Sequence, residues 1–356
     1  MRKQKFLIRT TALLLTMVST VASVVKAAPP AITPRTRDAI AHLGALLFND
    51  VSLSADSRVS CARCHQPDHV FSDSRSLAEG AYGMKGTRNA PSLLNAADRT
   101  TLFWDGRRSS LEELMLDPLL GPREHGLRDA DELVSRIDGD RAMRAAYAVA
   151  FGSRAPLSAK NLARSLAAYV STLRTSESLF DRYISGKDSS ALDAKEVHGY
   201  ELFKGRAGCS ACHLIGPTSA PLTDAQFHNQ GIGASYLQSN MRAVIDRALT
   251  IEPKDLGNVI QTDPQVGALG RFLVTRKSID IGAFRTPSLN NVSRSAPYMH
   301  DGSISTLEDA VKHELYYSAA DRGANFSHAE LEALVAFLET LADQSRSTVS
   351  PLEPPS

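Results

Sequence analysis

The chain has 356 residues, of which 40 are Lys or Arg and 39 are Asp or Glu, so its formal net charge is +1. The length suits two domains better than one. The near-neutral balance, with basic residues scattered along the chain, gives no support for nucleic-acid binding. Four cysteines could form two disulfides, but their spacing indicates a different use.

Residues 1–28 have the composition of a secretory signal peptide. Basic residues are followed by an apolar stretch through Val25 and by small residues at Ala27 and Ala28, an arrangement typical of a cleavage site. The stretch is short and interrupted by Ser and Thr, although an uncleaved anchor is the alternative. No later segment is long and apolar enough to span a bilayer. We therefore expect a periplasmic protein without stable membrane insertion after cleavage.

All four cysteines lie in two copies of the pattern Cys-x-x-Cys-His. The copies consist of Cys61, Cys64 and His65, and of Cys209, Cys212 and His213. This pattern is typical of c-type haem attachment, in which two thiols bond to the haem and the adjacent imidazole binds the iron. A zinc half-site would leave the paired histidine unexplained, and a thioredoxin-like redox pair would be expected once, in a βαβ unit. The sequence therefore predicts two covalently bound haem c groups.

Further motifs recur in the two halves of the chain. RNAPSLLN at residues 88–95 matches FRTPSLNN at residues 284–291, and FWDG at residues 103–106 matches YMHDG at residues 298–302. In each half, Asp-Gly is followed by a hydroxyl residue and acids placed as in a helix capping box. The interval from the first Cys to the motif Pro is longer in the second half, which indicates an insertion there.

Helical spacing of apolar residues predicts helices over residues 128–152, 157–185 and 327–342, and no run of alternating strand character is present. We therefore expect a mostly α-helical fold of two cytochrome c-like haem domains, with long loops, that arose by duplication. The N-terminal domain covers residues 29–190 and the C-terminal domain covers residues 191–356.

Together these motifs resemble the bacterial dihaem cytochrome c peroxidase superfamily, which includes MauG, and its MauG- and MbnH-like branch in particular. In members that need reductive activation, a His in a Gly-His-Gly loop binds the N-terminal haem iron. The matching residue here is Ala81, which cannot bind iron. The resemblance thus implies a first haem that is open to hydrogen peroxide, unless His69, Met84 or His125 takes the place of that ligand.

The resemblance also implies two residues for the chemistry. Cleavage of peroxide needs a group that moves a proton from the near oxygen to the far one, and the distal Glu of the family is matched by Glu124. A solvated surface acid is the alternative for this residue. The family's distal Gln is replaced by Leu114, and its Met after the Glu by His125. Trp104, the only Trp of the chain, matches the residue that relays electrons between the haems.

The sixth ligand of the second haem departs from the usual family pattern. Family peroxidases use a Met fourteen residues after the His of His-Asp-Gly, and Glu314 stands at that position. MauG-like members use a Tyr of the same helix, which implies Tyr317 or, with a shifted register, Tyr316. A phenolate ligand lowers the reduction potential. The alternative is that both tyrosines only pack, and that Glu314, His313 or no side chain binds the iron.

Two further sites follow from the resemblance. A calcium ion between the haems would be bound by the side chain of Asn89 and the main-chain oxygens of Ser295 and Pro297, which are the hard donors that Ca²⁺ prefers. Arg285 would meet a haem propionate, whose carboxylate a guanidinium matches.

Three functions are consistent with these residues. The first is a MauG- or MbnH-like enzyme that uses hydrogen peroxide to form a high-valent dihaem state and oxidises a Trp or Tyr of a partner protein. The second is a cytochrome c peroxidase that reduces hydrogen peroxide to water with electrons from a small cytochrome c or cupredoxin. The third is a non-catalytic dihaem electron carrier, against which Ala81 argues, because carriers usually have both irons six-coordinate. We expect the first function.

Overall fold

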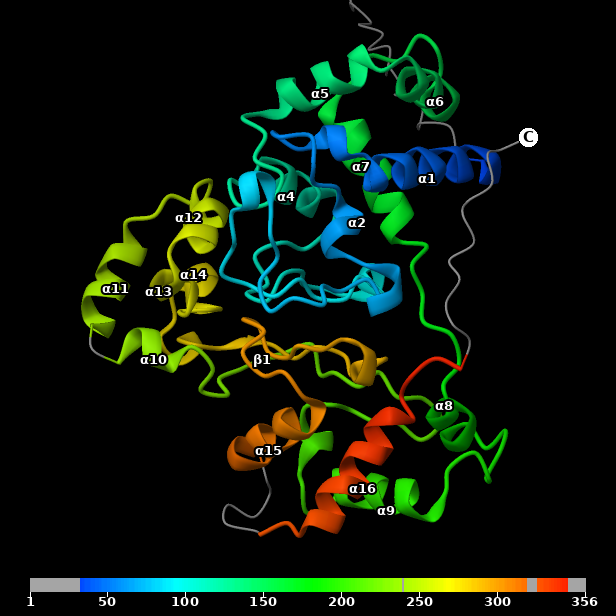
Figure 1. The fold of residues 1–356 in the computed structure, drawn as a ribbon, viewed down its shortest axis with the longest axis vertical. Helices are drawn as coiled ribbons and strands as arrows, with labels where there is room; N and C mark the ends of the chain where they lie inside the picture. The colour runs from blue at the N-terminus through cyan, green and yellow to red at the C-terminus, as the bar shows by residue number, and fades with distance from the viewer. Residues whose placement is uncertain (1–32, 239, 319–324, 345–356) are drawn as a thin grey trace, which may run out of the picture. The chain divides into compact units, whose positions relative to one another are not determined.

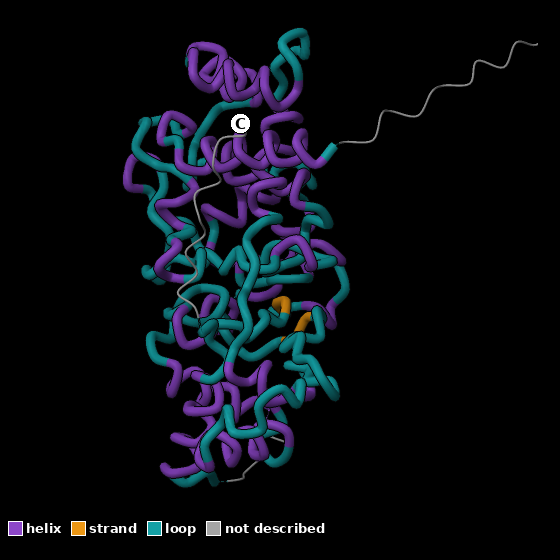
Figure 2. The backbone as a smooth tube through the Cα atoms, turned by 90° about the vertical axis from the view of Figure 1, so that its right-hand side faces the viewer, coloured by secondary structure: helices purple, strands orange, loops and turns teal. Residues whose placement is uncertain are grey.

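The computed structural model describes residues 33–238, 240–318 and 325–344, and the predicted signal peptide lies outside these ranges. Across the described ranges, helices joined by long loops make up the fold, and strand is confined to two short segments (Figure 2). The expectation of a mostly α-helical protein is therefore confirmed. None of the helices in these ranges has the length and apolarity needed to cross a bilayer.

The elements have the following bounds. The first half contains α1 (Pro34–Asn49), α2 (Cys61–Cys64), α3 (Leu111–Leu114), α4 (Leu116–Leu120), α5 (Ala130–Gly139), α6 (Arg141–Phe151) and α7 (Ala159–Val170). α8 (Leu179–Ile184) follows, and the second half then contains α9 (Ala194–Lys204), α10 (Ala234–Leu237), α11 (Met241–Leu249), α12 (Leu256–Thr262), α13 (Pro264–Gly267), α14 (Phe272–Thr275), α15 (Leu307–Ser318) and α16 (His328–Glu339). The strands β1 (Phe227–His228) and β2 (Phe284–Arg285) pair antiparallel.

Two helices expected from the sequence are each divided in the structure. The break between α5 and α6 lies at Asp140, whose carboxylate accepts hydrogen bonds from the backbone N–H groups of Ala142 and Met143. Ser178 likewise begins α8, with Asp181 completing a capping box. Each cap starts a new helix because it satisfies N–H groups that have no partner within the helix. Residues 174–178, RTSES, contain no apolar residue, so the second break could have been found in the sequence.

Two close helix crossings, one in each half, organise the core (Figure 1). α1 packs on α7, where a Cβ atom at Gly44 would overlap the backbone carbonyl of Ser165. α9 packs on α16, where a Cβ atom at Gly199 would overlap the backbone carbonyl of Ala333. Because glycine has no side chain, the two helix backbones can approach this closely. The same contact therefore recurs in both halves.

We expect Gly44→Ala and Gly199→Ala each to lower the free energy of unfolding by about 1–3 kcal/mol, because the added methyl group forces packed helices apart. Gly139→Ala is a matched control, since a Cβ atom there meets no atom within 4 Å. Denaturant unfolding followed by circular dichroism measures all three variants. Unchanged stability in the first two would contradict the close-approach argument.

The loops that carry the repeated motifs also share their backbone conformation. Left-handed residues occur in pairs that are each 196 positions apart: Asn95 with Asn291, Phe103 with Met299, and Gly106 with Gly302. The backbone N–H groups of the two asparagines donate to the carbonyls of Leu173 and Leu341, which follow α7 and α16. The motif repeat seen in the sequence therefore corresponds to a repeated loop structure.

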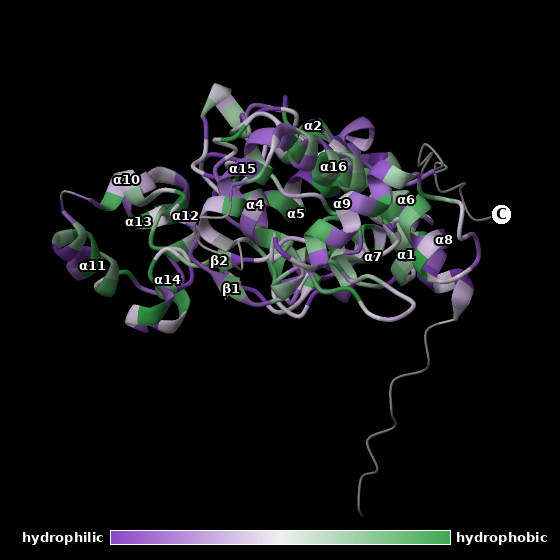
Figure 3. Ribbon diagram, turned by 90° about the horizontal axis from the view of Figure 1, so that it is seen from below, coloured by the Kyte–Doolittle hydropathy of each residue, from purple (hydrophilic) through white to green (hydrophobic). Residues whose placement is uncertain are grey.

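The longer Cys-to-Pro interval of the second half contains the helices α10 to α14, which have a small core of their own. Val244, Ile260 and Leu269 are among its buried residues, and α11 carries hydrophilic residues beside its hydrophobic ones (Figure 3). The segment is tied to the first half, because the hydroxyl of Thr87 donates to the carbonyl of Ile260 at 2.5 Å and Arg88 donates to the carbonyl of Gly267.

Candidate haem sites

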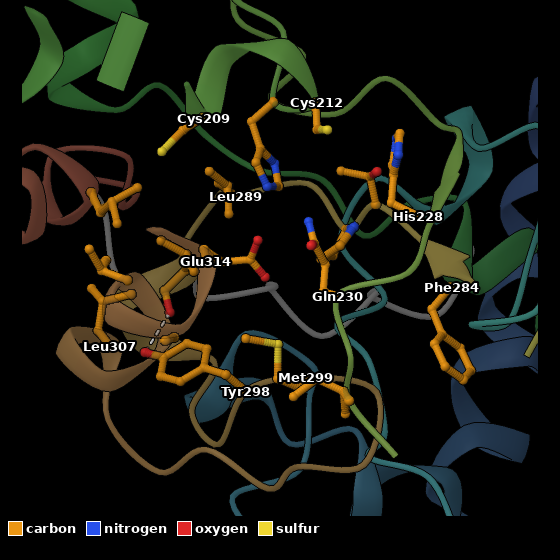
Figure 4. Close-up of a pocket in the computed structure, with 18 of the residues that line it drawn as sticks. Cys209, Cys212, His228, Gln230, Phe284, Leu289, Tyr298, Met299, Leu307 and Glu314 are labelled. Atoms are coloured by element: carbon orange, nitrogen blue, oxygen red, sulfur yellow. Dashed lines mark hydrogen bonds between the residues drawn. The ribbon is translucent and has the colours of Figure 1, made fainter. Parts of the chain in front are cut away.

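The second half contains a largely apolar cavity (Figure 4). Cys209, Cys212 and His213 of the second attachment motif line it. Much of the remaining wall is apolar and includes Phe203, Phe284, Leu289, Val292, Leu307, Val311, Leu334 and Leu338. An apolar slot beside two thiols and an imidazole fits a covalently attached haem, whose macrocycle is itself apolar.

Both motif histidines are oriented by a hydrogen bond at the ring nitrogen that does not bind iron. Nδ1 of His65 lies 2.9 Å from the carbonyl oxygen of Phe71, and Nδ1 of His213 lies 2.9 Å from that of Leu222. When Nδ1 donates, Nε2 carries the lone pair that binds a metal. Burial lowers the pKa of both imidazoles, which favours the neutral, metal-binding form. The two rings therefore fit the predicted proximal ligands.

A cluster of possible metal ligands adjoins the second motif. Cys212, Asp224 and His228 each bring one donor atom within 4.8 Å of the others, and Nε2 of His228 lies 2.7 Å from the Asp224 carboxylate. The thiol of Cys212 is consumed when it bonds to the haem. The remaining His–Asp pair is too small a ligand set for a separate structural metal site.

Two arginines, Arg285 and Arg99, have lowered pKa values. Arg285 lines the cavity, is 5 % exposed, and donates to the carbonyl oxygens of Phe103 and Thr286. Burial lowers the pKa of Arg285 to about 10. Burial, together with the charge of Arg285, lowers the pKa of Arg99 to about 9. Neighbouring cations that are removed from water, such as Arg285 and the half-buried Arg99, are stabilised by an anion, and haem propionates fit this role. Arg99 was not among the residues expected from the sequence.

In the first half, Glu124 lies beside the attachment motif. Burial raises the pKa of Cys61 and of Cys64 to about 12, and the negative charge of Glu124 adds to the effect in both. The carboxylate is therefore near both thiols. Its Oε2 atom is buried and, among the described residues, has no hydrogen-bond partner. Burial raises the pKa of Glu124 to about 7, and the positive charge of Arg107 opposes this rise. A carboxyl group with this pKa can both accept and donate a proton near neutral pH.

Ala81 packs directly against the same segment. Its backbone N–H donates to the carbonyl oxygen of Glu124 at 2.7 Å, and the residue is 1 % exposed. Gly80 precedes it because a Cβ atom there would overlap the carbonyls of Arg123 and Glu124. The residue that matches the family's distal His is therefore a buried alanine, hydrogen-bonded to the main chain of Glu124.

Of the residues that could replace the missing distal ligand, His125 is the one held beside the first motif. Its Nδ1 lies 2.8 Å from the carbonyl oxygen of Leu53 and its Nε2 lies 3.7 Å from Sγ of Cys61. These contacts hold the ring at the attachment thiol. Met84 is 37 % exposed, and His69 ends a 3-10 turn that begins at Pro67.

Arg107 is a further charged residue near Glu124 that was not expected from the sequence, although it ends the motif Phe-Trp-Asp-Gly-Arg. Its guanidinium lies 3.3 Å from the ring centre of Phe103 and pairs with Asp105 at 2.9 Å. Arg107 and Asp117 also line a second, polar cavity. The motif could have identified Arg107, because a positively charged Arg near a buried carboxyl group lowers the pKa of that group.

Trp104 connects the two halves. It belongs to the first half, yet it lines the cavity of the second. Its indole N–H donates to the carbonyl of Asn89 at 2.9 Å, and its own carbonyl accepts the backbone N–H of Arg285 at 2.8 Å. This position is compatible with the bridging role predicted for it.

Helix α15 directs Glu314, rather than either tyrosine, into the cavity. Glu314 lines the cavity with Leu307, Ala310 and Val311, whereas Tyr316 and Tyr317 are not among its lining residues. Tyr316 is 80 % exposed and Tyr317 39 % exposed. The hydroxyl of Tyr317 lies against Gly231, between the cavity-lining residues Gln230 and Ile232. A tyrosine ligand stays a prediction from the resemblance, and the structure does not bring either ring to the cavity.

The predicted calcium ligands lie in two loops. Asn89 is buried, and its side-chain amide donates to the carbonyls of Arg75 and Ser76, each at 3.2 Å. Ser295 and Pro297 lie just after the turn Val292–Arg294, and the hydroxyl of Ser295 donates to the carbonyl of Val292. The calcium site stays a prediction.

A mostly helical chain with two c-type haem motifs, one of them beside a buried carboxyl group, defines a dihaem cytochrome of the peroxidase class. Residues 38–189 match the family model described as Di-haem cytochrome c peroxidase. The chain is 33 % identical to the methylamine utilization protein MauG of Methylorubrum extorquens, over 91 % of this chain and 84 % of that protein. It is 32 % identical to the cytochrome c551 peroxidase of Pseudomonas aeruginosa, over 88 % of this chain and 82 % of that protein.

A solved structure supports the same assignment. A MauG-like protein associated with microbial copper homeostasis matches with a TM-score of 0.69 at 28 % identity, covering 94 % of this chain and 99 % of that one. The chain therefore belongs to the di-haem cytochrome c peroxidase/MauG family. It is a haem-dependent oxidoreductase that acts on peroxide, and the family carries two haem c groups. The chain is about as similar to relatives named MauG as to relatives named peroxidase. Sequence identity therefore does not distinguish the two branches of the family, and the residues of the two sites have to decide.

Proposed function

We propose that the protein is a periplasmic, MauG- and MbnH-like enzyme that uses hydrogen peroxide to oxidise a Trp or Tyr side chain of a partner protein. The haems supply iron that passes two electrons to peroxide and takes two from the partner. Peroxide gains two electrons and two protons and leaves as two water molecules, while the partner loses two electrons and two protons. The residues of this chain have to keep one iron accessible and move the protons.

The contact between Ala81 and Glu124 carries this proposal. A buried alanine in the loop that bears the distal His elsewhere supports an iron open to peroxide without prior reduction. The adjacent carboxyl group, with its pKa raised to about 7 by burial, is suited to take a proton from one peroxide oxygen and return it to the other.

The second half favours stored oxidation over rapid turnover with an electron donor. The Met used by family peroxidases is replaced by Glu314, and Met is the ligand that raises a haem's reduction potential. A second haem of low potential is a poor acceptor of electrons from a small cytochrome c or cupredoxin, which disfavours the peroxidase alternative. Trp104 lines the second cavity and is hydrogen-bonded to Asn89 of the first half and Arg285 of the second, so it is suited to share an oxidising equivalent between the haems.

We further propose the organisation predicted from the sequence. The two haem domains cover residues 29–190 and 191–356, and the recurring glycine crossings and left-handed loop residues support their origin by duplication. Asn89, Ser295 and Pro297 would bind Ca²⁺ between them. Residues 1–28 would direct export to the periplasm.

One equivalent of hydrogen peroxide added to the ferric holoenzyme tests the function. We expect a long-lived, two-electron-oxidised absorption spectrum and slow oxidation of reduced cytochrome c. Trp104→Phe should still react with peroxide at the first haem but lose the long lifetime, because the second equivalent is no longer shared. Immediate turnover of reduced cytochrome c without a persistent spectrum would favour the peroxidase alternative. A ferric spectrum that does not change when peroxide is added would leave the non-catalytic electron carrier as the remaining function.

A further inference from the structure

One face of α15 forms part of the wall of the second cavity. Leu307, Ala310, Val311 and Glu314 line it, and their spacing of three and four residues is that of a single helix face. Three of the four side chains are aliphatic, so Glu314 is the one on this face with a metal-binding atom. Figure 4 shows its carboxylate directed into the cavity, between the attachment cysteines and Tyr298.

Three other polar side chains of the wall also have hydrogen-bond partners. The pairs are His228 with Asp224 at 2.7 Å, the hydroxyl of Tyr298 with the carbonyl of Val292 at 3.1 Å, and Nδ1 of His300 with Arg88 at 2.9 Å. His300 is also stacked on Phe284, with ring centres 3.5 Å apart. These contacts hold the three side chains at the wall. Gln230 and Met299 also line the cavity, and the sulfur of Met299 is a second candidate ligand atom.

The tyrosines of α15 are not among the residues that line the cavity. Tyr317 is stacked at a tilt on His313 and at a right angle to Tyr316, and its hydroxyl meets the backbone at Gly231. Bringing Tyr317 to the cavity would require this segment of the wall to move. Glu314 needs no such movement.

We infer that a carboxylate oxygen of Glu314 is the sixth ligand of the iron bound by His213. A carboxylate is a hard, anionic donor and stabilises oxidised iron relative to reduced iron, in contrast to the thioether of Met. The substitution thus gives the second haem the electronic character that a phenolate would give it, by a different side chain. The inference rests on the proposed function in one respect, which is that a low potential of the second haem serves to store an oxidising equivalent.

Resting ferric holoenzyme, without peroxide, provides the test. Electron paramagnetic resonance and resonance Raman spectra of Glu314→Gln and Glu314→Met should change at the second haem and stay unchanged at the first. In Glu314→Met the spectrum should become that of a Met-ligated low-spin haem, and the midpoint potential of the second haem should rise. Haem staining and the signal of the first haem show that each variant is folded and loaded.

Tyr316→Phe, Tyr317→Phe and Met299→Leu are the matched variants, and each should leave the second haem's spectrum as in the wild type. A wild-type signal in both Glu314 variants, or its loss in any matched variant, would overturn the assignment. Because the readout is taken before peroxide is added, the ligand can be disproved while peroxide chemistry persists. Conversely, failure of the peroxide experiment would leave the ligand result standing.

Discussion

Glu124→Gln is expected to slow the reaction of the ferric first haem with hydrogen peroxide by about 10²–10⁴-fold, the contribution typical of a positioned acid–base group. Glutamine has the shape of glutamate but cannot accept the proton of the near oxygen and return it to the far one. The carboxylate lies near both attachment thiols, and its Oε2 has no partner among the described residues. Stopped-flow absorbance in a single turnover measures the rate constant.

The pH dependence gives a second readout. Burial raises the pKa of Glu124 to about 7, so the carboxylate that acts as base is populated as the pH rises through that value. The wild-type rate should therefore increase across this range, and Glu124→Gln should lose the increase. Glu112→Gln removes an exposed acid of α3 and is the matched control. An unchanged rate in Glu124→Gln would remove this residue from the mechanism.

The same raised pKa has a consequence for stability. The folded protein binds the proton of Glu124 more tightly than the unfolded chain, whose ordinary value is 4.5. The proton bound by Glu124 stabilises the folded protein. This stabilisation is fully present below pH 4.5 and is lost as the pH rises through about 7. At pH 8, Glu124→Gln should therefore be more stable than the wild type, by roughly 1–3 kcal/mol. A slower but more stable variant is typical of a residue kept for chemistry rather than for folding.

The haem chemistry could be predicted from the sequence because its residues are local in the chain. The thiols and the imidazole of each attachment motif occupy five consecutive positions, so no tertiary contact is needed to find them. Ala81 and Glu124 are far apart in the sequence, and their hydrogen-bonded contact was accessible through the resemblance alone. Periodicity also predicted helices correctly, but the break at Asp140 depends on a side-chain cap.

The tyrosine prediction shows the limit of such reasoning. Glu314 and Tyr317 lie three positions apart, so helical spacing puts both on nearly the same face of α15. Which of them meets the cavity depends on tertiary packing, because the hydroxyl of Tyr317 lies against Gly231, from a distant loop. Arg99 was missed for a related reason. Its position becomes meaningful when burial brings its charge close to that of Arg285.

Ala81→His is expected to convert the first haem from a peroxide-reactive site into a closed one. The backbone of residue 81 is fixed by its hydrogen bond to the main-chain carbonyl of Glu124, so residue 81 is held against the segment that carries the acid–base group. An imidazole there can bind the iron as the His of the Gly-His-Gly loop does in other members. If this imidazole occupies the open position of the first haem iron about 99 % of the time, the rate of reaction with peroxide falls about 100-fold.

Ala81→Leu is the control, because it adds comparable bulk without a ligand atom. We expect Ala81→His to give a low-spin ferric first haem that is unreactive towards peroxide until it is reduced, whereas Ala81→Leu should remain high-spin and reactive. Electron paramagnetic resonance identifies the spin state, and stopped-flow absorbance gives the rate. A high-spin, reactive Ala81→His variant would mean that residue 81 does not face the iron. The vacant position inferred at the first haem would then need another explanation, and the proposed oxidation of a partner protein would lose its main support.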